Sequence, residues 1–88
     1  MSWAFEFTPV AQKQLVKLGP SAAVKIRAYL EKRIKNVKDP RSLGKPLKGD
    51  LIGLWRYRVE DYRILARIED HRLIVTVVTV GHRRDVYE

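Results

Sequence analysis

The sequence predicts an α+β fold in which an N-terminal strand and two antiparallel helices precede a three-stranded antiparallel meander, with the helices packed on one face of the sheet. Two observations support this prediction. Apolar residues recur at helical spacing in the N-terminal half, and three runs in the C-terminal half alternate apolar with polar residues or are β-branched. The chain has 88 residues without a repeat or linker, so we expect a single domain over residues 1–88.

The first elements are a short strand and a helix. Residues 3–7 alternate large apolar side chains with small or polar ones, as a half-buried strand does. Thr8 is placed to cap a helix that has Pro9 at its first position, and Gly19 ends that helix after Leu18. We therefore expect a strand followed directly by a helix.

A second helix is predicted after Pro20. It has one apolar face and a basic outer surface that includes Lys25 and Arg33. A short link through Gly19 makes the two helices a hairpin, whose apolar stripe needs a sheet to cover it. The apolar face consists of Ala23, Ile26, Leu30, Ile34 and Val37.

The C-terminal half is predicted to supply the sheet. Residues 38–50 contain two prolines and two glycines, so we expect the second helix to end there in an exposed basic loop. Glu60 and Asp61 are typical of a two-residue hairpin turn, and the Val-rich last strand is expected to be central. The expected strands cover residues 54–59, 62–69 and 73–80.

Charge is the most informative bulk property of the chain. The 18 Lys and Arg residues against 10 Asp and Glu give a formal net charge of +8, which favours a polyanionic partner because each neutralised phosphate releases condensed counterions. The chain has no Cys, so thiolate sites and disulfides are excluded, and we expect no cofactor and no metal ion. No signal-peptide pattern or membrane-length apolar run is present, so we expect a cytoplasmic protein that does not bind membranes.

Three arginines are predicted to share one surface of the sheet. Arg56 and Arg58 are two residues apart on one strand, so both point away from the face that packs under the helices. Arg63 lies two residues past the turn and can approach Arg58 across the hairpin. Because crowded like charges repel, two interpretations stay open: ordinary surface arginines paired with Glu60 and Asp61, or a site for a functional anion.

The end of the chain adds groups suited to phosphodiester chemistry. Arg83 and Arg84 carry forked donors that match phosphate and can stabilise charge developing on phosphorus. Arginine rarely releases a proton, so proton transfer needs another group, and His82 and Tyr87 are the candidates. The structural alternative for each is a histidine in an exposed turn and a tyrosine that only packs its ring.

Two segments resemble the signatures of RelE toxins in the RelE/ParE toxin–antitoxin superfamily. They read GLWRYRVEDYRI over residues 53–64 and VGHRRDVY over residues 80–87. The order of strand, helix hairpin, Leu47-Lys48-Gly49 turn and meander is also similar to the family's over essentially the whole chain. The resemblance implies a RelE-like fold and a type II toxin that cleaves mRNA in the ribosomal A site without a metal, by attack of the 2′-hydroxyl on the adjacent phosphodiester, and so inhibits translation.

The resemblance also implies roles for individual residues. Tyr87 matches a tyrosine proposed to take part in proton transfer, while four arginines would bind the scissile phosphate and stabilise its extra negative charge. Two positions that are lysine in the best-known member are arginine here, so the general base stays open, and His82 is a candidate for it. The four arginines are Arg56, Arg58, Arg63 and Arg83, and further contacts to RNA or the ribosome are expected from Lys25, Arg33, Lys45, Lys48 and Arg84.

Two other functions remain open on the sequence. A toxin of the ParE branch shares the fold but inhibits DNA gyrase without catalysis, and a plain RNA-binding module would need only the cationic face. The arginine-rich strand and Tyr87 favour the nuclease. For each toxin, the expected partner is a cognate antitoxin, RelB-like and with an acidic segment, that forms a hetero-oligomer with the toxin.

Overall fold

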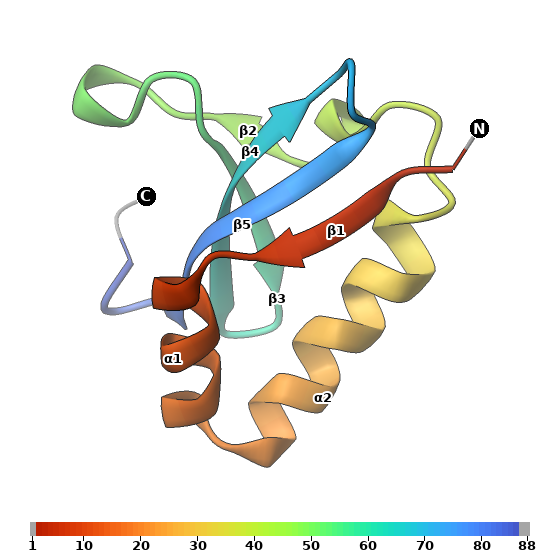
Figure 1. Ribbon diagram of the computed structural model, residues 1–88. Helices are drawn as coiled ribbons and strands as arrows, with labels where there is room; N and C mark the ends of the chain where they lie inside the picture. The colour runs from red at the N-terminus through yellow and green to blue at the C-terminus, as the bar shows by residue number, and fades with distance from the viewer. Residues whose placement is uncertain (1, 87–88) are drawn as a thin grey trace.

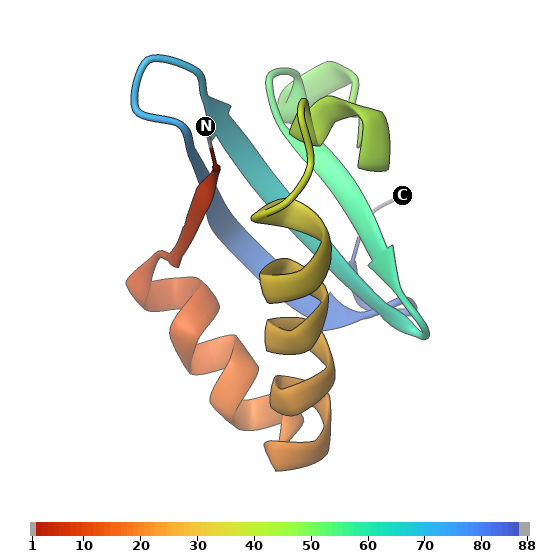
Figure 2. The same cartoon turned by 90° about the vertical axis from the view of Figure 1, so that its right-hand side faces the viewer.

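The computed structural model describes residues 2–86, and these form a five-stranded sheet with the order β1-β5-β4-β3-β2 and a helix hairpin on one face (Figures 1 and 2). The predicted α+β fold, with helices on one side of the sheet, is confirmed. The strands are β1 (Ala4–Phe7), β2 (Lys45–Pro46), β3 (Trp55–Val59), β4 (Tyr62–Glu69) and β5 (Ile74–His82), and the helices are α1 (Pro9–Leu18) and α2 (Pro20–Tyr29).

The predicted meander is formed by β3, β4 and β5. Val59 pairs with Tyr62, so the turn between β3 and β4 has two residues, and Glu60 adopts a positive φ of 54° there. The N-terminal strand β1 joins the sheet parallel to β5, which makes β5 a central strand as predicted. The short strand β2 extends the other edge by pairing with β3, a strand that the sequence did not predict.

The helices begin and end largely where the sequence indicates. The Thr8 hydroxyl accepts a hydrogen bond from the Ala11 amide at 3.1 Å, which caps α1, and Gly19 turns the chain into α2 with a φ of 100°. The predicted second helix is not α-helical throughout. It changes at Leu30 to a π-helical turn, η1 (Leu30–Ile34), in which the Lys35 amide donates to the Leu30 carbonyl at 3.2 Å.

The main core lies between the helices and the sheet. The apolar spacing predicted for the second helix is confirmed in Ile26, Leu30 and Ile34, which are fully buried. Burial on this scale is the main favourable contribution to stability in so small a domain. The helical residues pack against Trp3, Tyr57, Val59, Ile64, Ala66, Val75, Val77 and Val80.

A second, smaller apolar cluster lies on the opposite face of the sheet. It consists of Leu47, Leu65 and Val86, which are buried, and is flanked by Leu51 and Leu54. The loop after β2 and the segment that leads to Val86 therefore lie on the side of the sheet away from α2 (Figure 1).

Residues 38–50 are largely exposed, as the sequence predicts, but they are more ordered than a simple loop. They contain two 3₁₀ turns, η2 (Pro40–Leu43) and η3 (Gly49–Leu51), and strand β2 between them. The Tyr57 hydroxyl donates to the buried Pro40 carbonyl at 3.0 Å, and Leu47 is only 6% exposed. The segment is held because these long-range contacts satisfy its backbone and bury its apolar side chains.

Within residues 2–86, no helix is long and apolar enough to cross a membrane.

Candidate RNA-binding and catalytic face

Four cationic side chains gather on the sheet face opposite the helices. Lys45 of β2 pairs with Arg56 of β3, and Arg58 of β3 pairs with Arg63 of β4. Side chains alternate along a strand, so these residues share the face that Tyr57 and the other core residues do not use. We call Lys45, Arg56, Arg58 and Arg63 the arginine face, and the predicted approach of Arg63 to Arg58 is confirmed.

The four side chains differ in burial. Arg56 is 8% exposed and Arg63 is 6% exposed, whereas Arg58 and Lys45 are exposed. Arg56 and Arg58 both lie on the face away from the helices, as predicted, but Arg56 is buried there, which the sequence did not indicate. The reason is the second apolar cluster, whose loop and C-terminal segment cover this face beside both buried arginines.

Arg63 is held by the backbone of the hairpin turn. Its Nη1 donates to the Glu60 carbonyl at 3.1 Å and to the Tyr62 carbonyl at 3.0 Å. These contacts restrict the guanidinium to one orientation next to Arg58, the residue opposite on β3. A positive group fixed in this way costs little reorganisation when it binds an anion.

The carboxylates of the hairpin turn contact cations outside the arginine face. Glu60 Oε1 lies 3.0 Å from Lys25 Nζ on α2, and Asp61 lies 3.9 Å from Arg83 Nε. The Glu60 contact raises the pKa of Lys25, mainly through its hydrogen bond. The sequence interpretation in which Glu60 and Asp61 pair with the strand arginines is not what these contacts show.

A groove runs along the arginine face between β3 and the segment before β2. It has a volume of about 260 Å³, so it is large enough to hold several water molecules at about 30 Å³ each. Three of its lining side chains are cations, which makes it suited to an anionic group. The groove is lined by Ser42, Leu43, Gly44, Lys45, Arg56 and Arg58.

The C-terminal segment folds back beside the arginine face. The Arg83 amide donates to the Asp61 carbonyl at 2.7 Å, and the Asp85 amide donates to the His82 carbonyl at 2.8 Å. Val86 then packs over Gly81 so closely that a Cβ atom at Gly81 would lie 2.5 Å from Val86 Cγ2. Gly81 pairs with Arg63 on β4, so Val86 lies next to the buried arginine. Tyr87, the predicted proton-transfer residue, lies outside the described residues.

His82 is on the other face of the sheet. It pairs with Tyr62 on β4, and their rings make an edge-to-face contact with centroids 6.2 Å apart. Together with Gln14 and Lys17 of α1 it lines a separate groove on the helix side. The structure therefore does not bring His82 together with the arginine face, although the two are close in the sequence pattern.

The comparison with known proteins agrees with this arrangement. Residues 5–87 match the family described as the ParE toxin of the type II toxin–antitoxin system, parDE. The chain is 32% identical to the toxin RelG of Mycobacterium tuberculosis over 87 residues, which is 99% of this chain and 98% of that relative. The chain is a toxin of the RelE/ParE superfamily.

Solved structures share the fold of this toxin. A chain of the RelBE2 toxin–antitoxin complex of Mycobacterium tuberculosis superposes with a TM-score of 0.84 at 30% identity, covering 94% of this chain and 100% of that chain. The isolated RelE toxin of E. coli superposes with a TM-score of 0.69, covering 92% of this chain and 84% of that chain, at 19% identity. At that identity the second likeness concerns the fold alone.

The remaining predicted RNA contacts of the toxin lie in different places. Lys25 and Arg33 are on the helix side, where the Arg33 guanidinium lies 5.9 Å from the Tyr29 ring centroid. Lys48 is exposed at the start of η3, next to Leu47 of the second apolar cluster. Arg84 is exposed in the C-terminal turn, with its amide 3.4 Å from His82 Nδ1.

Sequence reasoning missed the wall of the groove. Ser42, Leu43 and Gly44 carry no chemical signature, and the contact that holds them joins Arg41 to Asp70, 29 residues later in the chain. The one local signal is Asp39 before Pro40, which is a pattern typical of a capped turn. Burial raises the pKa of both Tyr57 and Tyr29, and Tyr57 lies on the helix side of the sheet, away from the arginine face.

Proposed function

We propose that this toxin is a ribosome-dependent endoribonuclease that cleaves mRNA in the A site and so inhibits translation in the cytoplasm. The observation that carries the proposal is the arginine face, in which the backbone-held Arg63 lies opposite the exposed Arg58 on a rigid pair of strands. Donors held in place before a reaction stabilise developing charge better than mobile ones. Similarity to toxins named RelG and RelE supports the same assignment.

In the proposed reaction, the ribose 2′-hydroxyl attacks the adjacent phosphorus. The 2′-oxygen loses its proton, the bond from phosphorus to the 5′-oxygen breaks, and that oxygen takes up a proton. The products are a 2′,3′-cyclic phosphate and a free 5′-hydroxyl. We propose that Arg56, Arg58, Arg63 and Arg83 bind the scissile phosphate and stabilise the added negative charge of the transition state.

Proton transfer is proposed for Tyr87, which directly follows Val86 in the sequence. Positive charges favour the phenolate form of a tyrosine, and the arginines of the proposed site would supply them. We propose that no metal ion is needed, because guanidinium groups can supply the positive charge that a metal otherwise provides.

We further propose that a RelB-like antitoxin keeps the toxin inactive in a hetero-oligomer. The relative with a TM-score of 0.84 is described as part of the toxin–antitoxin complex RelBE2, and E. coli RelE has been solved with a peptide of RelB. An acidic segment of such a partner would neutralise the arginine face. A purified complex that leaves Arg58 accessible and cleaves at the full rate would contradict this.

Gyrase inhibition is the second candidate, because the family that residues 5–87 match is described by its ParE member. Such a toxin would need no proton-transfer group and no fixed phosphate site. It would inhibit supercoiling by purified gyrase, which the proposed nuclease would leave unchanged.

The deciding experiment compares mRNA on programmed ribosomes with the same mRNA free in buffer, both with chelator. We expect cleavage on ribosomes alone, lost in Arg58→Ala and retained in Arg67→Ala. Arg67 is a matched control because it is an exposed arginine on the same sheet, four residues or about 13 Å along the strand from Arg63. Cleavage of free RNA only would show that the toxin is a nuclease that does not depend on the ribosome. Gyrase inhibition without any cleavage would show that the toxin is a gyrase inhibitor instead.

A further inference from the structure

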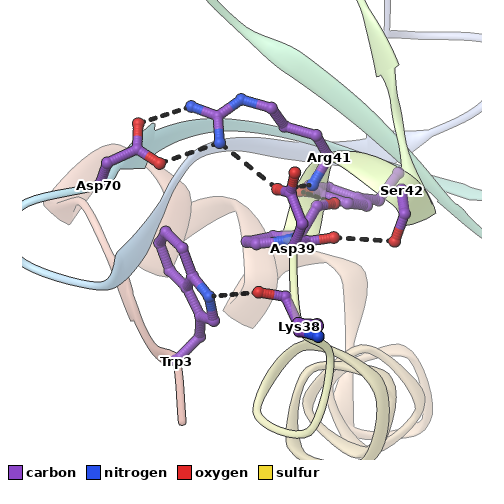
Figure 3. Close-up of polar contacts among 8 residues, drawn as sticks. Trp3, Lys38, Asp39, Arg41, Ser42 and Asp70 are labelled. Atoms are coloured by element: carbon purple, nitrogen blue, oxygen red, sulfur yellow. Dashed lines mark hydrogen bonds and ion pairs between the residues drawn. The ribbon is translucent and has the colours of Figure 1, made fainter. Parts of the chain in front are cut away.

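Arg41 connects the segment that forms one wall of the groove, residues 42–45, to the rest of the fold. Arg41 Nη1 and Nη2 donate to the two carboxylate oxygens of Asp70 at 2.9 and 2.6 Å, and Nη1 also lies 3.4 Å from Asp39 (Figure 3). Its guanidinium carbon is 5.9 Å from the ring centroid of Trp55 on β3. Arg41 therefore joins η2 to the β4–β5 turn and to the first residue of β3.

Other contacts place the same segment on the sheet. Trp3 Nε1 donates to the Lys38 carbonyl at 3.3 Å, as Figure 3 also shows. Gly44 lies so close to β3 that an added Cβ atom would be 2.8 Å from the Arg56 carbonyl oxygen and 2.9 Å from the Tyr57 ring. The backbone at Gly44 therefore lies directly against β3, and residues 42–45 form the outer wall of the groove.

The groove in turn holds three of the cations of the proposed site. Lys45 pairs with Arg56, and Arg58 lies two residues further along the same face. Arg58 is also opposite Arg63, so the groove continues directly from the position proposed for the scissile phosphate. Successive phosphates of a single RNA strand could therefore occupy the two positions.

We propose that Arg41 is a positioning residue that holds residues 42–45 as the wall of a subsite for the phosphate next to the scissile one. This inference rests on the proposed nuclease function and names a further part of its substrate site. Arg41 touches neither phosphate. It acts by keeping Lys45 and the Gly44 backbone at a fixed distance from Arg56 and Arg58, and Lys45 is the cation that we assign to the adjacent phosphate.

The toxin offers a matched control at the same turn. Arg72 lies two residues after Asp70 and pairs with Glu69 at 2.8 Å and with Glu6 at 3.7 Å, so its removal also breaks exposed ion pairs. Neither of those partners belongs to the groove segment. Arg72→Ala therefore reproduces the loss of charge and of an ion pair at this turn without releasing the wall.

The test is single-turnover cleavage on programmed ribosomes over a range of toxin concentrations. For Arg41→Ala we expect the half-saturating concentration to rise about fivefold while the maximal rate stays within about twofold, because the group that binds is misplaced and the reacting groups are not. Arg41→Lys should recover only part of the loss, since lysine cannot form the bidentate pair. Arg72→Ala should behave as wild type.

Hydrogen exchange gives a readout that does not depend on activity. The Gly44 amide donates to the Arg41 carbonyl at 3.3 Å, and in Arg41→Ala it should exchange faster while amides of β5 stay protected. Unchanged Gly44 exchange, or a half-saturating concentration equal to that of Arg72→Ala, would overturn the inference.

If wild-type toxin cleaves nothing, the proposed function fails instead, and binding of a 2′-deoxy-substituted oligonucleotide then tests the subsite. Equal affinity of Arg41→Ala and Arg72→Ala for that oligonucleotide would overturn it.

Discussion

Arg63 combines a structural contact with a proposed chemical role in one side chain. Its Nη1 is committed to the carbonyls of Glu60 and Tyr62, while the residue itself is 6% exposed beside Arg58. A lysine at this position keeps the charge but has no planar fork with which to hold two carbonyls and also face a phosphate. The orientation of the guanidinium, rather than charge alone, should decide activity.

Arg63→Lys tests that argument. We expect cleavage on ribosomes to slow by about 10²-fold, and the free energy of unfolding to fall by about 1 kcal/mol because the part-buried carbonyls of Glu60 and Tyr62 lose their donor. Single-turnover cleavage and urea unfolding measure the two effects. Arg67→Lys, on the same strand but exposed, should change neither. A wild-type rate in Arg63→Lys would show that charge is enough.

His82 is separated from the proposed chemistry by the sheet itself. It pairs with Tyr62, and its ring contacts that of Tyr62 on the helix side. We expect His82→Ala to cleave at a rate within about twofold of wild type, and Tyr87→Phe to lose about 10²-fold. If the pH–rate profile of His82→Ala lacked a limb that is present in the wild type, His82 would have to be considered a proton-transfer residue again.

At the scale of elements, the C-terminal segment and Gly81 form one unit. Gly81→Ala places a methyl group 2.5 Å from the present position of Val86 Cγ2, so the segment must move away from Arg63. We expect a larger loss of cleavage than of stability, because Val86 belongs to the smaller apolar cluster and not to the main core. Faster exchange of the Asp85 amide, which donates to His82, would confirm the displacement. An undisturbed Asp85 amide together with lost activity would contradict it.

The connection between η2 and the β4–β5 turn should depend on pH. Hydrogen bonding to Arg41 lowers the pKa of Asp70 below its ordinary 3.8. A carboxylate whose pKa is lower in the folded state stabilises the fold above its unfolded pKa, and this contribution is lost as the pH falls through the folded value. The difference in unfolding free energy between wild type and Asp70→Asn should therefore be largest near neutral pH and disappear once the pH has fallen through the folded pKa, which lies below 3.8. A difference that is constant with pH would show that the ion pair does not contribute.

The elements also show how far the sequence could predict this protein. The bounds of strands and helices with a clear apolar period were predicted to within a few residues. The spacing of Ile26, Leu30 and Ile34, for example, shows in the sequence itself which side of the helix is buried. The groove wall and the burial of Arg56 were not predicted, because both depend on contacts between segments far apart in the chain. The 3₁₀ turn η2 is held by Asp70, which is distant in the sequence, so no local pattern predicts it. The sequence of a strand with outward-pointing arginines is also the same whether or not another segment covers that face.

At the scale of the whole molecule, most of the net positive charge lies in the helices and not around the arginine face. Residues 9–38, the helix layer, contain eight of the 18 Lys and Arg residues and one of the 10 acidic residues, so they carry +7 of the total of +8. The remainder of the chain, with the arginine face, is close to neutral in sum. The helix layer therefore dominates the attraction to a polyanion at long range, while the arginine face acts at short range.

This division predicts that binding and cleavage can be weakened separately. In Lys32→Gln with Arg33→Gln, which removes two exposed charges of the helix layer, association with ribosomes should slow. The salt dependence of binding should fall by about 0.7 to 0.9 in log–log slope for each phosphate that the variant no longer neutralises. The cleavage rate at saturating toxin should not change. Arg67→Gln with Arg72→Gln removes the same charge from β4 and the β4–β5 turn, and association of this variant should stay closer to wild type. If the two double variants weaken association equally, net charge alone attracts the toxin and the position of the helix layer does not matter.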